Sequence, residues 1–452
     1  MTDENNKVTS ETEKDPQFSF IKETIRPKKR TRLKKIMFTC GLAVLFGLIS
    51  SVTFCAVFPV VSNWMGWDRT TVLFDKSTLE PSARPTIMPT IEPTVVPTKE
   101  PVKTASPKPS ANPGVSQAPI IITNEIHIDA TIEDFQKIYK DIDKVMDTMD
   151  QSILTVISVK SSKDVFEESY EKADETAGII VANNNAELLI LVQYDRIKEA
   201  NRLRVRFHDM SITDATMLSI HEELGLAVLA VKLSDLAEDT ISGCNIATLG
   251  ESYSLAAGDV VLAVGNPNGY MYSRDIGIIS NELKTTYVTD NCIELIHTNL
   301  RDNAYGDGVL INLKGEVVGI LSRQFKKDLN EKICMGIGIS RLKPMIERMV
   351  NKEEFRYFGV KANDITPEVA EKVGFNSGIY ISKVESNSPA FEAGIKAGDI
   401  IQQVDETAIN TVKVFYNILN NKSVNEDVNV QLVRKRAEEY ESLQFTVKIK
   451  AR

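Results

Sequence analysis

Prolines divide this chain into two unequal parts. Ten of the 17 prolines fall between residues 81 and 119, and five of them recur at every fourth position from Pro85 to Pro101. Proline lacks a backbone N–H donor, so this segment suits neither a helix interior nor a central strand. It is typical of a stiff, extended linker. We therefore place a Pro/Thr-rich spacer at 62–119, with a Pro-rich docking ligand as the alternative.

The shorter, N-terminal part joins a basic run to an apolar one. Seven Lys or Arg and no acid lie between residues 24 and 36, and the next 25 residues, Met37–Val61, carry no charge. That length suffices to span a bilayer. The basic flank predicts a cytoplasmic tail over 1–36 and one transmembrane helix over 37–61, with the main domains outside the cytoplasm. A cleaved signal peptide is the alternative.

Composition excludes several classes of protein. The net charge of −9 opposes nucleic acid as the main partner. The five Cys and four His show no metal-ligand spacing, so we expect neither a metal nor a cofactor. Two of the cysteines, Cys292 and Cys334, form either a disulfide with each other or two buried thiols.

The longer, C-terminal part changes its pattern twice. Residues 129–149 have the apolar spacing of an amphipathic helix. Short β-rich runs then follow at intervals of about 8–20 residues, which predicts a barrel or sandwich closed by a short helix at 342–350. The runs are 153–159, 177–181, 188–192, 203–207, 227–231, 259–264, 276–279, 309–311 and 317–321. The last unit, 353–452, combines strands with helices at 389–393 and 412–420.

Three segments resemble the HtrA/DegP family of trypsin-like serine proteases. They are the Gly-Asn-Pro-Asn-Gly loop at 265–269 with the strand to Ser280, the hairpin 310–320, and the Gly-Ile-Gly-Ile-Ser run at 336–340. The run Tyr-Phe-Gly-Val at 357–360 is similar to the carboxylate-binding loop of that family's PDZ domains. The resemblance implies a mainly β fold. A trypsin-like double β-barrel over 120–352 precedes an α+β PDZ domain over 353–452.

The PDZ resemblance implies a peptide-binding groove. In such a groove, successive backbone N–H groups hold a C-terminal carboxylate and the peptide adds as a strand to a sheet edge. The loop residues Tyr357, Phe358, Gly359 and Val360 would form one wall. Val414 and Ile418 on the 412–420 helix would form the other.

The positions of the family's catalytic triad carry other residues here. Matching each motif in turn puts Tyr194 at the His position, Gly225 at the Asp position and Gly306 at the Ser position. Tyrosine is a poor base at neutral pH, and glycine has no functional side chain. A base relocated to His221, with Asp307 as the reactive group, is the remaining catalytic arrangement.

The sequence therefore predicts a membrane-anchored, extracytoplasmic HtrA-like pseudoprotease. Its PDZ domain would bind peptides or C-termini of envelope proteins, in quality control or regulation. The alternatives are an active HtrA-type serine endopeptidase with an unrecognised catalytic arrangement, and a passive structural tether. Family resemblance implies a homo-oligomer, a trimer.

Overall fold

The computed structural model describes residues 69–75, 130–163, 169–281, 283–326, 332–437 and 439–452, with seven positions between 37 and 53. The side chains of 161–172 are not among them. The predicted tail, most of the predicted membrane helix and most of the Pro-rich segment lie outside the described residues. Within the described part, no helix is long and apolar enough to cross a membrane. The chain divides into Met1–Asp68 and a body, Arg69–Arg452.

The first part of the body is a closed barrel with strand order β1-β2-β3-β6-β5-β4. The apolar runs of the neighbouring strands β3 and β6 are buried along almost their whole length, because their alternate side chains pack into two different cores. Its strands are β1 (Ile153–Lys163), β2 (Ser169–Asn183), β3 (Glu187–Gln193), β4 (Arg202–Arg206), β5 (Ile212–His221) and β6 (Leu226–Lys232). Short helices α3 (Tyr194–Ile197) and α4 (Glu238–Ser242) follow β3 and β6.

The second part is a curled sheet with strand order β8-β7-β11-β12-β13-β10-β9. A bridge between Ile279 and Thr298 ties the end of β8 to β10, so the sheet nearly closes into a second barrel. Its strands are β7 (Val260–Asn266), β8 (Ser273–Ile278), β9 (Lys284–Val288), β10 (Asn291–Arg301), β11 (Asp307–Ile311), β12 (Val317–Leu321) and β13 (Ile333–Gly338). The helix α5 (Ile339–Val350) follows and buries its apolar face in the core that both barrels share.

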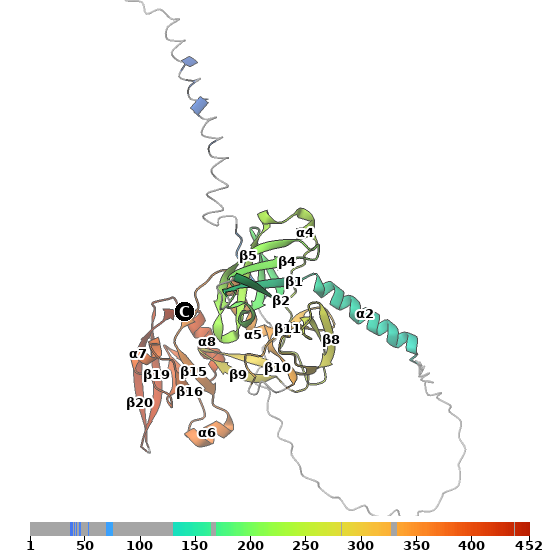
Figure 1. Cartoon of the computed structure of the whole chain (residues 1–452). Helices are drawn as coiled ribbons and strands as arrows, with labels where there is room; N and C mark the ends of the chain where they lie inside the picture. The colour runs from blue at the N-terminus through green and yellow to red at the C-terminus, as the bar shows by residue number, and fades with distance from the viewer. Residues whose placement is uncertain are drawn as a thin grey trace, which may run out of the picture. The chain divides into compact units, whose positions relative to one another are not determined.

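Helix α2 (Ile132–Asp150) precedes the first barrel and projects away from it (Figure 1). Thr131 caps it: the Asp134 N–H donates to the Thr131 hydroxyl over 3.2 Å, and the Thr131 N–H donates to the Asp134 carboxylate over 3.0 Å. Its C-terminal turn buries Met146 and Met149 against the barrels. Arg274 on β8 adds an ion pair to Asp150 there.

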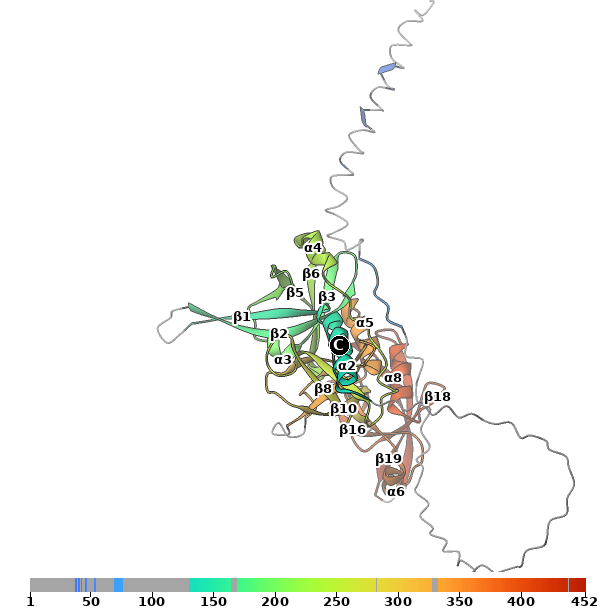
Figure 2. The same cartoon turned by 90° about the vertical axis from the view of Figure 1, so that its right-hand side faces the viewer.

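A short extended segment, Arg69–Asp75, packs along the first barrel and α5, and we call it the strap (Figure 2). The Thr70 N–H donates to the Asn184 carbonyl over 3.0 Å. Val72 exchanges two hydrogen bonds with the Asn351 side chain, at 2.9 and 2.7 Å, and the Phe74 N–H donates to Glu347 over 3.0 Å. The linker placed at 62–119 therefore includes seven residues that belong to the folded body.

The last part is an α+β domain with strand order β15-β16-β17-β19-β20. Its helices are α6 (Pro367–Val373), α7 (Pro389–Ala393) and α8 (Val412–Asn420). Its strands are β14 (Arg356–Tyr357), β15 (Val360–Asp364), β16 (Ile379–Val384), β17 (Ile400–Val404), β18 (Thr407–Ala408), β19 (Asp427–Arg436), β20 (Glu439–Lys448) and β21 (Lys450–Ala451). Two aromatic rings, Phe358 and Phe415, meet edge to face at 5.2 Å in its core.

The mainly β prediction is confirmed, and so are the helices expected at 389–393 and 412–420. The expected strands all occur, but four more were not predicted: β5, β9, β10 and β13. Strand β5 mixes polar and apolar side chains and none of its residues is fully buried, so it lacks an apolar run that would mark it. Strands β9 and β10 form a hairpin with Thr289 and Asp290 in its turn.

Candidate functional site

Two of the three triad positions meet at the ends of neighbouring strands. Strands β3 and β6 pair so that Gln193 faces Leu226. Tyr194, the first residue of α3, donates its N–H to the Gly225 carbonyl over 2.8 Å. Gly225 ends a single turn of 3-10 helix with φ of 66°, a left-handed conformation that suits glycine. The structure thus brings these two positions together, but no imidazole or carboxylate stands at either.

The third position, Gly306, lies in the loop 303–306 just before β11. The Gly306 N–H donates to the Asn303 carbonyl over 3.0 Å, and the Tyr305 N–H donates to the Asn303 side-chain oxygen over 2.9 Å. A Cβ on Gly306 would lie 2.5 Å from the Pro267 carbonyl oxygen. The loop therefore has no room for a nucleophilic side chain. Two N–H groups of the kind that stabilise an oxyanion are already bonded within it.

Arg196 on α3 connects this loop to the other two positions. Its guanidinium lies over the Tyr305 ring, 5.5 Å from the ring centroid. Its Nε is 3.6 Å from a carboxylate oxygen of Asp307. Arg196 thus links α3, which begins at Tyr194, to the segment that contains Gly306.

Asp307, the first residue of β11, is fully buried. Its carboxylate accepts hydrogen bonds from the Thr176 hydroxyl and, over 2.9 Å, from the Ala177 N–H on β2. Burial raises the pKa of Asp307 to about 6, although the Thr176 hydroxyl and the Ala177 N–H oppose this change. Arg196 and Asn266 also lower the pKa of this carboxyl. The Asp307 carboxylate joins β11 of the second barrel to β2 of the first.

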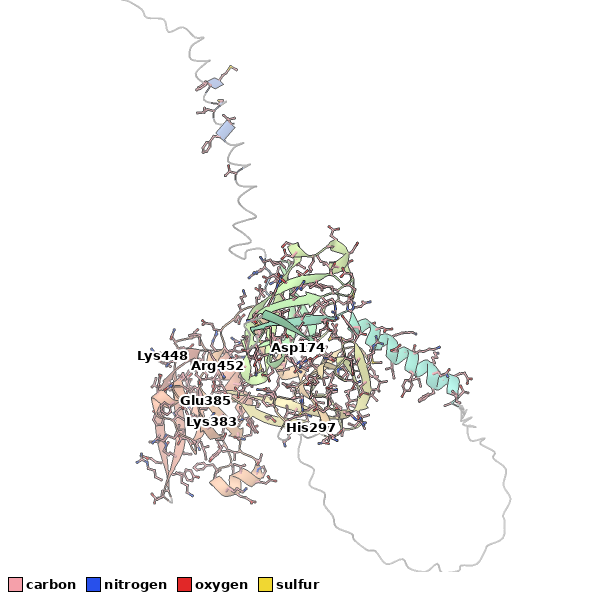
Figure 3. All side chains as sticks on the ribbon, in the orientation of Figure 1. Asp174, His297, Lys383, Glu385, Lys448 and Arg452 are labelled. Atoms are coloured by element: carbon pink, nitrogen blue, oxygen red, sulfur yellow. The ribbon has the colours of Figure 1, made fainter. Side chains whose placement is uncertain are left out.

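The relocated base does not lie near Asp307. His221, at the end of β5, packs edge to face on Phe355 at 5.0 Å, next to the PDZ domain. Burial, together with the nearby Arg452, lowers the pKa of His221 to about 4. His208 bonds the Asp150 carbonyl at 2.8 Å, and His297 lies on β10 (Figure 3). His127 is outside the described residues.

Neither thiol nor metal chemistry has a site in the described part of the chain. Cys292 and Cys334 are separate buried thiols in two different cores, so the disulfide alternative is wrong. Burial raises the pKa of Cys292 to about 11 and that of Cys334 to about 12, which suppresses the reactive thiolate. The described residues contain no cluster of three or more His, Cys, Asp or Glu that could hold a metal ion.

The loop 357–360, at the start of the PDZ domain, has a backbone conformation that requires the glycine it contains. Gly359 has φ of 93°, and a Cβ there would lie 2.1 Å from the Ser388 Cβ, so only glycine fits. The side chains of Phe358 and Val360 are fully buried in the PDZ core, and Tyr357 is half-buried. Val414 and Ile418 on α8 lie partly buried against the same core.

The carboxylate-binding loop already holds a carboxylate. The N–H groups of Phe358, Gly359 and Val360 all donate to the side chain of Asp290, over 2.8, 2.9 and 2.9 Å. Asp290 belongs to the β9–β10 turn of the second barrel, and it is 7% exposed. Burial raises its pKa to about 6, opposed by these three N–H groups. The sequence predictions missed Asp290; an Asp-Asn pair between two β-rich runs marks a turn, but not its partner.

Comparisons with known proteins identify two kinds of domain in the chain. A family model described as a trypsin-like peptidase domain matches residues 176–320. A model described as a PDZ domain matches residues 335–449. The latter range begins in β13 and includes α5, which packs on the barrels.

The chain is also similar to curated serine proteases. A probable periplasmic serine endoprotease, DegP-like, of Rickettsia prowazekii (strain Madrid E) is 29% identical over 285 residues, which is 61% of this chain and 53% of the relative. The serine protease Do-like HtrA of Bacillus subtilis (strain 168) is 28% identical over 306 residues, 62% of this chain and 67% of the relative. The chain thus spans between about half and two thirds of the length of these relatives.

A solved structure of the HtrA-type protease AlgW with a decapeptide has the same fold. It is 22% identical, with a TM-score of 0.51, and the match covers 69% of this chain and 98% of that one.

Proposed function

Because this chain is HtrA-like, a trypsin-like peptidase domain followed by a PDZ domain, we propose that it is a pseudoprotease that binds peptide C-termini through its PDZ domain. One observation carries the proposal. Three successive backbone N–H groups of the PDZ loop converge on one carboxylate at 2.8–2.9 Å. A peptide C-terminus presents the same chemical group, and strand addition to the edge of β15 would supply its main-chain bonds.

The state of the peptidase domain supports the absence of proteolysis. Acyl transfer needs a nucleophile, a base beside it and N–H donors aimed at the developing oxyanion. Neither the nucleophile nor the base is supplied by Tyr194, Gly225 or Gly306. The N–H groups of Tyr305 and Gly306 donate to Asn303 instead of to a substrate. The barrels would then act as a scaffold that positions the PDZ domain.

The proposed location is extracytoplasmic. The segment 37–61 would anchor the chain as a single-pass membrane protein with its N-terminus in the cytoplasm. The name of the Rickettsia relative, a periplasmic protein, is consistent with folded domains outside the cytoplasm. The ligands would be C-termini or exposed segments of envelope proteins, in quality control or its regulation. A homo-trimer is the assembly that family resemblance implies.

A second candidate function, serine endopeptidase activity, is favoured by the names of the relatives. Both of the relatives above are named as serine proteases. For this chain, activity would require a side chain other than the three matched positions to act as nucleophile. Asp307, the first residue after the loop 303–306, is the candidate reactive group, and its burial opposes the role.

The deciding experiment offers the full chain both kinds of substrate. We would incubate it in detergent with an unfolded protein and with peptides that have free C-termini, and identify products and retained peptides by mass spectrometry. Intact substrate with selective retention of peptides supports the proposal. Cleavage products that disappear in the Asp307→Asn variant would establish an unusual protease instead. A substitution at Gly359 is not a clean test of the groove, because any Cβ there collides with Ser388.

A further inference from the structure

The hairpin turn at Asp290 contacts the PDZ loop in the manner of a bound peptide. Both carboxylate oxygens are used: the Gly359 N–H lies 2.9 Å from each, while the Phe358 and Val360 N–H groups each donate to one. In return, the Asp290 N–H donates to the Val360 carbonyl over 2.7 Å. Carboxylates that accept several backbone N–H bonds form strong, charge-assisted contacts.

The residue before Asp290 adds one main-chain contact at the sheet edge. Thr289, which follows β9, forms a single antiparallel bridge with Lys361 on β15, the edge strand of the PDZ sheet. Tyr287 on β9 and Cys292 on β10 pack against the PDZ core, of which Val414 and Ile418 form part. Main-chain pairing at a sheet edge with side chains set against the groove is how peptides bind to PDZ domains.

The turn is built to present its carboxylate there. Asp290 has φ of 59°, a left-handed conformation that Asp and Asn adopt more readily than other side chains. On the side of the first barrel, Glu223 accepts hydrogen bonds from the Thr289 N–H over 2.9 Å and from its hydroxyl over 3.2 Å. Beside the turn lies a cavity of about 300 Å³, whose lining includes Asp290, His221 and Tyr357. The turn is therefore held on one side and has free space on another.

We propose that Asp290 is an internal ligand of the PDZ domain, and that a peptide C-terminus enters the groove only by displacing the β9–β10 turn. This inference rests on the proposed function of the loop 357–360 as a peptide site. The displacing ligand is a polypeptide with a free C-terminal carboxylate, since that group replaces the Asp290 side chain. Its binding separates the groove from the second barrel, so occupancy of the PDZ domain is coupled to the contact between the domains.

The internal ligand lowers the apparent affinity for peptides. Only molecules with an empty groove are competent to bind. The apparent Kd therefore equals the intrinsic Kd divided by the fraction of molecules with an empty groove. If the turn is docked in about 99% of molecules, the loss is roughly 100-fold. Removing the Asp290 charge would restore most of that affinity.

The test uses the full chain with Asp290→Asn, which keeps the size of the side chain and its tolerance of a left-handed φ. The new amide turns an N–H toward backbone donors, so the contact weakens. We expect amide hydrogen exchange at Phe358, Gly359 and Val360 to accelerate at least tenfold without any peptide. Affinity for dye-labelled decapeptides that end in a free Val carboxylate should rise at least tenfold. The affinity for the same peptides with amidated C-termini should not change between the wild type and the variant.

Asp405→Asn is the matched control. Asp405 also has a left-handed φ, 49°, and lies in a PDZ turn, but its carboxylate accepts from the Asn429 N–H over 2.9 Å and pairs with Lys422. This control should leave both the exchange rates of the loop and the affinity for peptides unchanged. Should the Asp290→Asn variant fold poorly, the wild-type chain provides a second measurement: added free-carboxylate peptide should speed exchange at the Asp290 N–H.

The outcomes separate the internal ligand from the proposed function. Unchanged loop exchange in the variant, or equal peptide affinity in variant and wild type, would overturn the internal ligand and leave peptide binding intact. Faster exchange with no peptide binding by either protein would overturn peptide capture, and with it the displacement step.

Discussion

The molecule contains two loops that are shaped to hold an oxygen of a ligand, and they differ in how their N–H groups are satisfied. In the loop 303–306, the N–H groups of Tyr305 and Gly306 bond to Asn303 within the same turn. In the loop 357–360, three N–H groups bond to Asp290, about 70 residues earlier in the chain. Each loop also lies beside a buried aspartate with a raised pKa.

This difference separates a closed site from an occupied one. A donor that is satisfied inside its own turn cannot receive a ligand unless the turn itself unfolds. A donor that is satisfied by a distant segment can exchange one carboxylate for another when that segment moves away, without unfolding of its own turn. The N–H groups of the loop 303–306 are therefore used within their own turn, while those of the loop 357–360 are bonded to a distant segment of the chain.

The largest effect should come from restoring the missing hydroxyl. Gly306→Ser places a Cβ within 2.5 Å of the Pro267 carbonyl oxygen, and a backbone atom cannot easily move aside. We expect a loss of about 3 kcal/mol in the free energy of unfolding, measured with urea, and no gain of proteolysis. Gly243→Ser, where the nearest atom to a Cβ is at 3.4 Å, is the control and should cost less than about 1 kcal/mol. Equal stability of the two variants would mean that the loop is open.

The second effect is the pH dependence that Asp307 confers. Its pKa is about 6 in the folded chain against 3.8 for the free side chain. Between these values the folded state retains a proton that the unfolded state has lost, so stability falls as pH rises from about 4 to about 6. Asp307→Asn removes this loss. As pH rises from 4 to 7, the free energy of unfolding of the variant should increase by roughly 2–3 kcal/mol relative to that of the wild type. Parallel profiles of the two proteins in denaturant titrations would contradict the assignment.

Removing the Thr176 hydroxyl should have an intermediate effect. Thr176 is buried and donates to the Asp307 carboxylate, so Thr176→Val keeps the shape and removes the donor. A hydrogen bond to a charged group contributes about 1.5–3 kcal/mol to the free energy of unfolding. We expect Thr176→Val to lower this free energy by an amount near the lower end of that range at pH 7. Combining this variant with Asp307→Asn in a double-mutant cycle measures the coupling. Additive losses would show that the two side chains do not interact.

The smallest effect should come from the charge at the rim of the PDZ contact. Arg452 (Figure 3) lies 3.5 Å from Glu223, and its side chain is 47% exposed. Exposed ion pairs contribute little, so Arg452→Ala should change stability by less than about 0.5 kcal/mol. Exchange rates at Gly359 should stay near those of wild type. If they rose as much as in Asp290→Asn, the rim charge and not the internal carboxylate would hold the turn.

Local patterns predicted the folds of both domains, because apolar runs, glycine turns and helix caps act over a few residues. The helix at 412–420 and the glycine at 359 are examples: the first has an apolar face, and the second needs a left-handed backbone. The motif alignment of Tyr194 and Gly225 also depended on local strand patterns, and the two lie in contact.

Contacts between distant segments could not be predicted in this way. Nothing near Asp290 in the sequence indicates that its side chain reaches residues 358–360, since turn residues are chosen for backbone conformation. The strap was likewise not predicted, because its backbone bonds to side chains at and after the end of α5, Glu347 and Asn351, which lie more than 270 residues away in the chain. Such pairings become visible only when the fold has brought the segments together.

The strap changes the topological role of the Pro-rich segment. The Pro-rich segment is preceded by the strap and followed by the capped start of α2, and both belong to the same body. The chain between them is therefore a loop that begins and ends on that body. Closing a loop costs free energy only as the logarithm of its length, about 0.6 kcal/mol for each doubling. Insertions or deletions there should therefore be nearly neutral for folding. After a cut within 76–129, the contacts described for the strap, Arg69–Asp75, would still attach the N-terminal piece to the body without a covalent link.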